Sequence, residues 1–399
     1  MILHYARHID AGAARIATAH DGWSNIMTMP IVTVRTITEN LKQELAALLE
    51  PFAQHLILSG RSVLIKPNLV EPEPWTSGQT TNPALVEALV QWCRAQGASR
   101  IAIGEGPSYF QPASDLEACF TKTGIADVAR RQHIEWILFD KDSYRTFSHH
   151  SPNTPSQFSV SEHAFRWDHI INVPVPKPHY LTTVSIAMKN LKGFIKREHK
   201  PLFHHAGKLG IHGSVTDLNL LVRPSLNIVD GTAGIHNNKQ FLLAGTDIVA
   251  VDAVTAALMG FNPQEIGTIR LGAAAGLGQM DLTAITIIGS HITELRINIE
   301  QPLDFLRKEF PGITLQAAQA CSGCLIPLFA ALRRLCGQNI RPYRPLTLAL
   351  GIQPSPVSGA VCIGRCATPA DQKQTMWLHA CPPSQNEVFD FLRSCFGHR

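Results

Sequence analysis

The cysteines near the end of the chain are the residues whose types and spacing point most directly to chemistry. Seven of the nine cysteines lie from Cys321 onward. Cys321 and Cys324 are separated by two residues, and Cys366 and Cys381 follow singly. A Cys-x-x-Cys pair places two thiolates on one side of a tight turn, and two further segments can complete a four-sulfur shell. Such shells hold iron–sulfur clusters or zinc, so the pattern predicts a metal centre.

The spacing of the later cysteines favours a [4Fe–4S] cluster, with zinc as the alternative. Short structural zinc sites commonly use two Cys-x-x-Cys pairs, whereas scattered single cysteines can come from loops that close over a larger cluster. Cys362 is an extra thiol four residues before Cys366, and it could be a spare ligand, a redox-active thiol or a buried side chain. The remaining cysteines are expected to be ordinary core or surface residues: Cys93, Cys119, Cys336 and Cys395.

The cysteine pattern resembles the cluster-binding region of hydrogenase small subunits and of the related quinone-reductase subunit. The shared features are Cys321-x-x-Cys324, then Gly364-Arg365-Cys366, then Cys381-Pro382-Pro383. The resemblance implies one [4Fe–4S] cluster ligated by Cys321, Cys324, Cys366 and Cys381. The chain departs from that pattern at Ala380, where glycine usually precedes the last cysteine.

Strand and helix patterns alternate through the first three quarters of the chain. A short β-rich run, Ser62–Lys66, is followed by a helix start at Asn82-Pro83 and by a second strand, Arg100–Ile103. This alternation predicts an α/β fold with a mainly parallel sheet. Further strands are expected over 136–140, 169–173, 226–229 and 285–289, and a helix over 246–259. Residues 1–305 would form this α/β domain, in one or two lobes, and residues 306–399 a smaller cysteine-rich cluster-binding domain.

Polar residues follow several of the predicted strands. In parallel sheets the loops at the carboxyl ends of the strands form the ligand crevice. Lysine binds anions as a point charge and its pKa falls on burial, while histidine exchanges protons near neutral pH. We therefore expect a site for an anionic small molecule, with catalytic roles for His179, Lys189 and Lys66. The predicted binding residues are Lys66, Asn68, Glu105, Lys177, Lys189 and Asn190.

Two aspartates further along the chain have a different expected role. Asp247 and Asp252 lie at the start of the predicted helix 246–259. A carboxylate at a helix N-terminus accepts hydrogen bonds from free backbone N–H groups and offsets the helix dipole. We expect these two residues to cap a helix rather than to bind a metal.

Several motifs occur in order from about Val63 to Gly289. They are Ile65-Lys66-Pro67-Asn68-Leu69, Gly104-Glu105-Gly106-Pro107, Lys177-Pro178-His179, and the segments 185–193, 228–231 and 244–253. Together they resemble the bacterial and archaeal family known only as domain of unknown function 362. The resemblance implies the α/β fold together with an iron–sulfur module, although the family name gives no reaction.

A second resemblance, over Asp168 to Gly193, is to nickel-pincer lactate racemases. His179 precedes Lys189 by ten residues, and in those enzymes a pair with this spacing serves in acid–base chemistry and in binding. The segment Gly104-Glu105-Gly106-Pro107 lacks the histidine that follows in the racemases. That difference argues against a paired-histidine racemisation mechanism.

Composition excludes several functional classes. The 399 residues are 45% apolar and 17% charged, as in globular proteins, and the net charge of +4 is too small to predict nucleic-acid binding. The locally basic segment Lys192–Lys200 is expected to be a solvated or anion-binding loop. No apolar run is long enough to span a membrane. Met1–Thr18 contains charged residues and lacks the apolar core of a signal peptide, so we expect a cytoplasmic protein.

Three functions fit these observations. The favoured one is a redox enzyme, an oxidoreductase that uses a [4Fe–4S] cluster and acts on an anionic small molecule. The second is an electron-transfer or cofactor-assembly protein that works with a redox partner protein. The third is a racemase- or epimerase-like enzyme. The chain has no Gly-x-Gly-x-x-Gly fingerprint and no phosphate loop, so nothing predicts NAD or ATP, whereas flavin and nickel stay open.

Overall fold

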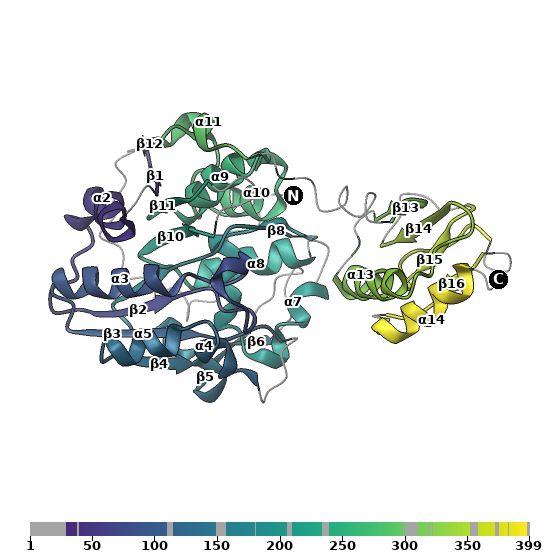
Figure 1. Cartoon of the computed structure of the whole chain (residues 1–399), viewed down its shortest axis with the longest axis horizontal. Coiled ribbons are helices and arrows are strands. Elements are labelled where there is room, and N and C mark those ends of the chain that lie inside the picture. The colour runs from purple at the N-terminus through teal and green to yellow at the C-terminus, as the bar shows by residue number, and fades with distance from the viewer. Residues whose placement is uncertain are drawn as a thin grey trace. The chain divides into compact units, whose positions relative to one another are not determined.

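The chain forms two compact units. A computed structural model describes residues 29–37, 40–109, 115–148, 157–179, 181–205, 210–233, 239–297, 299, 310–317, 320, 322–351, 358–371, 375–381 and 383–396. The first unit is made of Met1–Pro178 and Val184–Ile299, and the second of His179–Thr183 and Glu300–Arg399. Figure 1 labels the helices and strands of both units.

An eight-stranded sheet is the centre of the first unit. Its strands lie in the order β12-β1-β11-β10-β7-β2-β3-β4. All neighbours are parallel except β11, which runs antiparallel to both β1 and β10. This arrangement confirms the predicted α/β fold with a mainly parallel sheet. The strands are β1 (Ile31–Thr36), β2 (Ser62–Lys66), β3 (Arg100–Glu105), β4 (Glu135–Leu138), β7 (His169–Asn172), β10 (Leu226–Gly231), β11 (Phe241–Gly245) and β12 (Thr286–Gly289).

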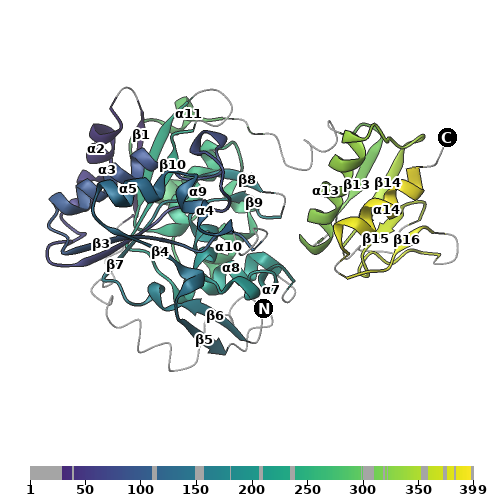
Figure 2. The same cartoon turned by 60° about the horizontal axis from the view of Figure 1, so that its bottom comes forward.

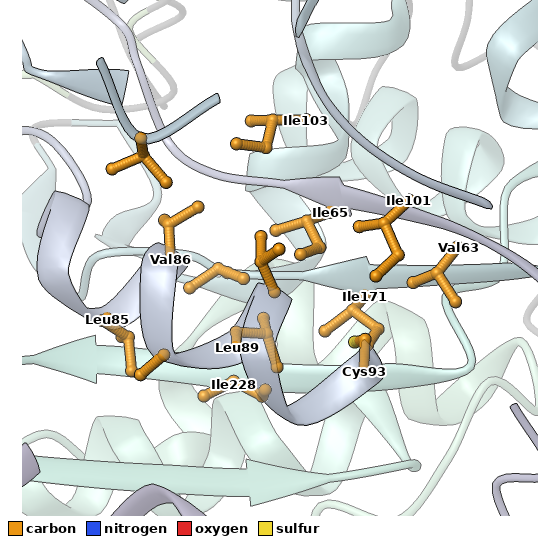
Figure 3. Packing of buried hydrophobic residues seen from close by; sticks show 14 of the residues in the cluster. Val63, Ile65, Leu85, Val86, Leu89, Cys93, Ile101, Ile103, Ile171 and Ile228 are labelled. Atoms are coloured by element: carbon orange, nitrogen blue, oxygen red, sulfur yellow. The ribbon is translucent and has the colours of Figure 1, made fainter. Parts of the chain in front are cut away.

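Three helices cover one face of this sheet: α2 (Leu41–Ala53), α3 (Pro83–Ala95) and α5 (Ile125–Arg131). Leu89 and Cys93 of α3 lie against Val63 and Ile171 in the core beneath them (Figure 3). Cys93 is fully buried, which confirms that it is a packing residue, and burial raises its pKa to about 12. The predicted start of α3 is also correct, because the Asn82 side chain accepts a hydrogen bond from Ala84 N.

The helices of a second group pack against one another, with α10 in contact with both of the others: α8 (Gly210–Leu221), α9 (Ile248–Leu258) and α10 (Gly267–Ala274). Helix α9 contacts β1, β10 and β11 of the large sheet. Figure 2 shows both groups of helices in one view, α8, α9 and α10 as well as α2, α3 and α5. Two hairpins accompany the main sheet, β5 (Tyr144–Ser148) with β6 (Gln157–Ser161) and β8 (Lys177–His179) with β9 (Thr183–Ser185). The shorter helices are α4 (Ala118–Thr121), α6 (Ala187–Asn190), α7 (Leu202–His205) and α11 (Ile292–Leu295).

The second unit is a smaller parallel α/β layer. Its sheet has the order β13-β14-β15-β16, and every neighbouring pair is parallel. Apolar residues of α13 and α14 share one core with one face of the sheet. The strands are β13 (Ile313–Gln316), β14 (Leu346–Leu350), β15 (Val361–Ile363) and β16 (Trp377–Leu378), and the helices are α13 (Ser322–Gly337) and α14 (Gln385–Phe396). Sequence patterns did not predict these short strands.

Within the described residues, no helix combines the length and the apolar character that a membrane span requires.

Candidate functional site

Three neighbouring parallel strands end at the same edge of the large sheet. Lys66 is the last residue of β2, Asn172 of β7 and Glu105 of β3. Lys66 is in register with Asn172, and Ile65 with Ile103. The alternation of strands and helices fixes this arrangement, because parallel strands present their carboxyl ends at one edge. The structure therefore brings the predicted residues Lys66 and Glu105 together.

Lys66 and Glu105 form a buried ion pair. The Lys66 Nζ lies 2.8 Å from Glu105 Oε2, and the two side chains are 0% and 4% exposed. Glu105 also accepts hydrogen bonds from Gly106 N at 2.8 Å and Leu69 N at 3.4 Å. Burial lowers the pKa of Lys66, and the Glu105 carboxylate opposes that shift. Complete burial favours a positioning role for Lys66 over direct contact with a ligand.

Gly193 rests directly on this ion pair. A Cβ at Gly193 would lie 1.9 Å from Glu105 Oε1 and 2.7 Å from Lys66 Nζ, distances that no real side chain tolerates. A Cβ at Gly106 would lie 2.4 Å from Gly193 O. Only glycine fits at these two positions, and the close approach fixes the short 3₁₀ helix Leu191–Phe194, which follows α6, against the ends of β2 and β3.

Asn68, Lys177 and Asn190 are joined by hydrogen bonds beside the ion pair. Lys177 Nζ donates to Asn68 Oδ1 at 2.9 Å and to Gln79 O at 2.6 Å. Asn68 Nδ2 donates to Asn190 Oδ1 at 2.6 Å. These three predicted residues come from the loop after β2, from β8 and from α6, so the fold collects them from distant parts of the sequence.

Two further asparagines extend this network into the sheet and were missed from the sequence. Asn190 Nδ2 donates to Asn172 Oδ1 at 2.8 Å, and Asn172 Nδ2 donates to Asn227 Oδ1 at 2.9 Å. Asn172 and Asn227 are fully buried. The signal that could have found them is an amide inside an apolar strand, since a buried amide needs hydrogen-bond partners.

Positive charge is concentrated around these residues. Burial lowers the pKa of Lys177 to about 7, with a further contribution from the charge of Lys189. Burial also lowers the pKa of Lys189 to about 8 and that of Lys200 to about 8. The pKa of Lys192 falls well below its ordinary value through burial and through the neighbouring Lys189 and Lys200. At neutral pH several of these amines therefore exchange protons readily.

Lys200 corrects the expectation that the segment Lys192–Lys200 is solvated. Its side chain is buried, and Nζ donates to Gly106 O and Pro107 O, each at 2.8 Å. The segment folds against the end of β3 because the ammonium satisfies these two carbonyl oxygens. The local excess of basic residues could not show this, because a basic run has the same composition in solvent and against a strand end.

An aspartate from α9 holds the short helix that carries Lys189 and Asn190. Asp252 accepts hydrogen bonds from Ala187 N at 2.7 Å and Met188 N at 3.2 Å. Burial raises the pKa of Asp252 to about 7. Asp247 accepts from Val249 N and Ala250 N at the start of α9. The predicted capping role of both aspartates is confirmed, although Asp252 caps α6 rather than its own helix.

His179 lies at the end of β8, in the short segment His179–Thr183 that belongs to the second unit. Its Nδ1 accepts hydrogen bonds from Leu181 N at 3.2 Å and Thr182 N at 3.3 Å. A ring nitrogen that accepts two N–H groups carries no proton, so the neutral imidazole has its proton on Nε2. The two units divide the predicted acid–base pair, with Lys189 in the first unit.

The cysteines of the second unit gather at the carboxyl edge of its sheet. Cys324 lies in the first turn of α13, Cys366 follows β15 and Cys381 follows β16. A Cβ on Gly364 would lie 2.5 Å from Cys324 Sγ and 3.9 Å from Ala380 O. The thiol of Cys324 therefore packs against Gly364, two residues before Cys366, and Ala380, the residue before Cys381, lies near the same glycine. Cys366 and Cys381 are exposed. Cys321 lies outside the described residues.

Cys362 and Cys336 differ from these cysteines. Cys362 is fully buried within β15, where Ala349 and Trp377 flank it on neighbouring strands. Burial raises its pKa. Cys336 lies near the end of α13, packed against the core of the unit. Of the alternatives for Cys362, the structure favours a buried packing residue. Among the described residues no group of three or more His, Cys, Asp and Glu side chains is arranged to hold a metal ion.

Together these features define a mixed α/β domain with a cation-rich edge, followed by a smaller parallel α/β unit. Residues 63–257 match the model of the family described as a domain of unknown function, DUF362. This part of the chain is thus similar to DUF362 domains.

Two comparisons with individual proteins accompany this family match. The thylakoid-associated protein sll1697 of Synechocystis sp. is 25% identical over 286 residues, which cover 67% of this chain and 86% of that protein. The lactate racemase apoprotein from Thermoanaerobacterium thermosaccharolyticum is similar in structure, with a TM-score of 0.39 and 13% identity. That similarity covers 55% of this chain and 54% of the racemase.

Proposed function

We propose that the first unit binds a small molecule bearing a phosphate or carboxylate group, beside Lys177 and Lys189. One observation carries this proposal: the hydrogen-bond partners of Lys177 are the neutral oxygens of Asn68 and Gln79, while the carboxylate of Glu105 is already paired with Lys66. Burying several ammonium groups together is unfavourable unless anions pair with them. A bound anion would supply the missing negative charge.

The partial exposure of three lysines supports the same site. Lys177, Lys189 and Lys192 are half-buried, whereas Lys66 and Lys200 are buried. The half-buried amines are the ones that can reach a ligand, while Lys66 and Lys200 fix the ends of β2 and β3 behind them. Asn68 and Asn190 then act by holding Lys177 in place through the hydrogen bonds of their amide groups. The proposed binding residues are thus Lys177, Lys189 and Lys192.

Proton uptake on binding tests this site. A bound anion raises the pKa of neighbouring lysines, so a lysine that is partly neutral at pH 8 takes up a proton when the anion binds. Calorimetric titration with inorganic phosphate at pH 8, in two buffers of different ionisation enthalpy, should show net proton uptake. Affinity should fall as the pH rises through about 7 to 8, because Lys177 and Lys189 then lose their charge. Binding that is independent of pH over this window contradicts the proposal.

Acid–base catalysis is the chemistry that these lysines support best. The pKa of about 7 for Lys177 and of about 8 for Lys189 let either amine give or take a proton at neutral pH. This observation keeps the racemase- or epimerase-like function as a second candidate. Exchange of the α-hydrogen of a 2-hydroxy acid with deuterated solvent, measured by NMR, would support it. No exchange with a panel of such acids would remove it.

We also propose that the second unit holds an iron–sulfur cluster and that the protein is a redox enzyme. Cys324, Cys366 and Cys381 lie at one sheet edge, Cys321 precedes α13, and the helix N-terminus beside them stabilises thiolates. These four residues would hold a [4Fe–4S] cluster, which would supply one-electron chemistry when bound. The alternative with the same donors is zinc.

Metal analysis of anaerobically purified protein tests the cluster. We expect a brown protein with about four irons per chain. A colourless protein with one zinc would replace the redox function by a structural metal site. Cluster-bearing protein without any anion binding would favour the electron-transfer or assembly function, with a redox partner protein.

We expect the protein to act in the cytoplasm.

A further inference from the structure

A line of hydrogen bonds between side-chain amides begins at Lys177 and leads into the sheet. The Lys177 ammonium donates to Asn68 Oδ1, and Asn68 donates through Nδ2 to Asn190 Oδ1. Asn190 in turn donates to Asn172 Oδ1 at 2.8 Å. Each amide receives a hydrogen bond on its oxygen and gives one from its nitrogen, so all donors point the same way.

The line ends inside the sheet. Asn172 Nδ2 donates to Asn227 Oδ1 at 2.9 Å and to Ala187 O at 3.1 Å, and Asn227 Nδ2 lies 3.4 Å from Gly245 O. Asn172 is the last residue of β7, and Asn227 lies in β10 beside it. The inner end of the line is therefore anchored on backbone carbonyl oxygens, which accept but never donate.

We propose that Asn172 and Asn227 are positioning residues that keep the carbonyl oxygen of Asn68 directed at Lys177, and so keep Lys177 charged and aimed for an anion. The inference rests on the anion site proposed above and adds residues remote from it. The backbone carbonyls of Ala187 and Gly245 require the Nδ2 groups of Asn172 and Asn227. With its Nδ2 so directed, Asn172 turns its Oδ1 toward Asn190 and accepts from Asn190 Nδ2. Asn190 in turn presents its Oδ1 to Asn68 Nδ2, which leaves Asn68 Oδ1 facing Lys177.

Reversing the line would be unfavourable at both ends. If Asn68 turned over, its Nδ2 group would face the Lys177 ammonium, a donor against a donor. Buried amides that lose their partners cost about 1 to 3 kcal/mol each, so the described orientation is strongly preferred. The other charged groups that act on Lys177 are Lys189, which repels it, and Glu71 and Glu105, which attract it.

The test compares Asn172→Leu with Asn172→Asp in the full chain. Leucine removes the nearer of the two acceptors of Asn190 Nδ2 and leaves only Pro67 O at 3.4 Å. Asn190 and Asn68 can then turn over, and Lys177 keeps Gln79 O as its remaining oxygen partner. A buried aspartate at this position is neutral when protonated and then offers one accepting oxygen and one O–H donor, as asparagine offers an oxygen and an N–H group. The readout is the pKa of Lys177, from the pH dependence of its labelling by an amine reagent, followed by mass spectrometry.

We expect Asn172→Leu to lower the Lys177 pKa by about one unit, which corresponds to about tenfold in its protonation equilibrium. Asn172→Asp should keep the wild-type value. Thr33→Val is the matched control, because Thr33 is a buried residue of the same sheet whose hydroxyl bonds Leu48 O and Ala244 O. It should leave Lys177 unchanged. If Asn172→Leu does not fold, Asn227→Leu provides the same comparison.

The possible results separate this inference from the proposed function. An unchanged Lys177 pKa in Asn172→Leu and in Asn227→Leu overturns the inference, whether or not phosphate binds. A lowered pKa with about tenfold weaker phosphate binding at pH 7.5 supports both proposals. A lowered pKa in a protein that binds no anion supports the positioning role and removes the anion site.

Discussion

Lys66 Nζ lies 2.8 Å from Glu105 Oε2, and this ion pair joins the carboxyl ends of two neighbouring strands, β2 and β3, below the surface of the molecule. The pair is covered by Gly193, and the lysines that can reach a ligand lie beside it. At this cation-rich edge Lys66 therefore has a structural role, while the half-buried lysines beside it are the ones proposed to bind an anion. Each residue of the edge can therefore be tested for its own role.

Substitutions of the ion pair should couple strongly. Lys66→Met leaves Glu105 buried without its partner, and Glu105→Gln leaves Lys66 in the same condition. Each should lower the free energy of unfolding by about 3 to 5 kcal/mol, because an uncompensated buried charge is costly. The double variant should lose clearly less than the sum. Urea unfolding measures all three, and additive losses would show that the pair does not act as a unit.

Gly193 should tolerate no side chain. The Cβ of Gly193→Ala would meet Glu105 Oε1 at 1.9 Å, so the 3₁₀ helix Leu191–Phe194 must move away from the ion pair. We expect a loss of about 1 to 3 kcal/mol in unfolding free energy, together with weaker phosphate binding. Gly337→Ala is the control, since nothing lies within 4 Å of a Cβ there. Equal stability of the two variants would mean that Gly193 is not in close contact with Glu105.

Stability should rise with pH above neutrality because of Lys177. Its pKa is about 7 in the folded protein against an ordinary value of 10.5, so the unfolded chain binds more protons between these values. Raising the pH across this window releases protons from the unfolded state and favours folding. Lys177→Met should flatten this increase. Urea midpoints from pH 7 to 10 measure it, and identical pH profiles for wild type and variant would contradict the shifted pKa.

The proposed cluster should depend on three of the described cysteines and not on two others. Cys324→Ser, Cys366→Ser and Cys381→Ser should each remove most of the iron and the broad visible absorption, because each takes away one thiolate. Cys362→Ala and Cys336→Ala should keep both, since these residues pack in the core. Loss of iron in Cys362→Ala with retention in Cys366→Ser would exchange the roles of those two cysteines.

Gly364 offers an independent test of the same edge. An alanine there would place Cβ 2.5 Å from Cys324 Sγ, on a backbone with φ of +90°. Both effects displace Cys324 from the turn that carries Cys366. We expect Gly364→Ala to retain less iron after gel filtration than Gly337→Ala, the control in the same unit. Full iron occupancy in Gly364→Ala would show that Cys324 does not ligate from this position.

The sequence by itself determined the class of fold and pointed to several residues that the structure brings together at one edge. A short β-rich run and an Asn-Pro helix start predicted β2 and α3, and the alternation of strands and helices predicted the parallel sheet, because these signals are local to the sequence. Lys66 and Glu105 could be placed on one edge because they follow strands. Asn68, Lys177 and Asn190 stood in motifs that resembled a family, and the structure joins them by hydrogen bonds.

Only the tertiary structure decided which of these residues are buried and what they contact. The amide line joins Asn68 to Asn190 across 122 residues, and no local pattern specifies such a contact. Likewise, the sequence predicts that Lys200 is exposed to solvent, whereas in the structure its ammonium donates to the carbonyl oxygens of Gly106 and Pro107. Burial sets the pKa of a lysine and the orientation of an amide, and burial is a property of the whole fold rather than of the neighbouring residues in the chain.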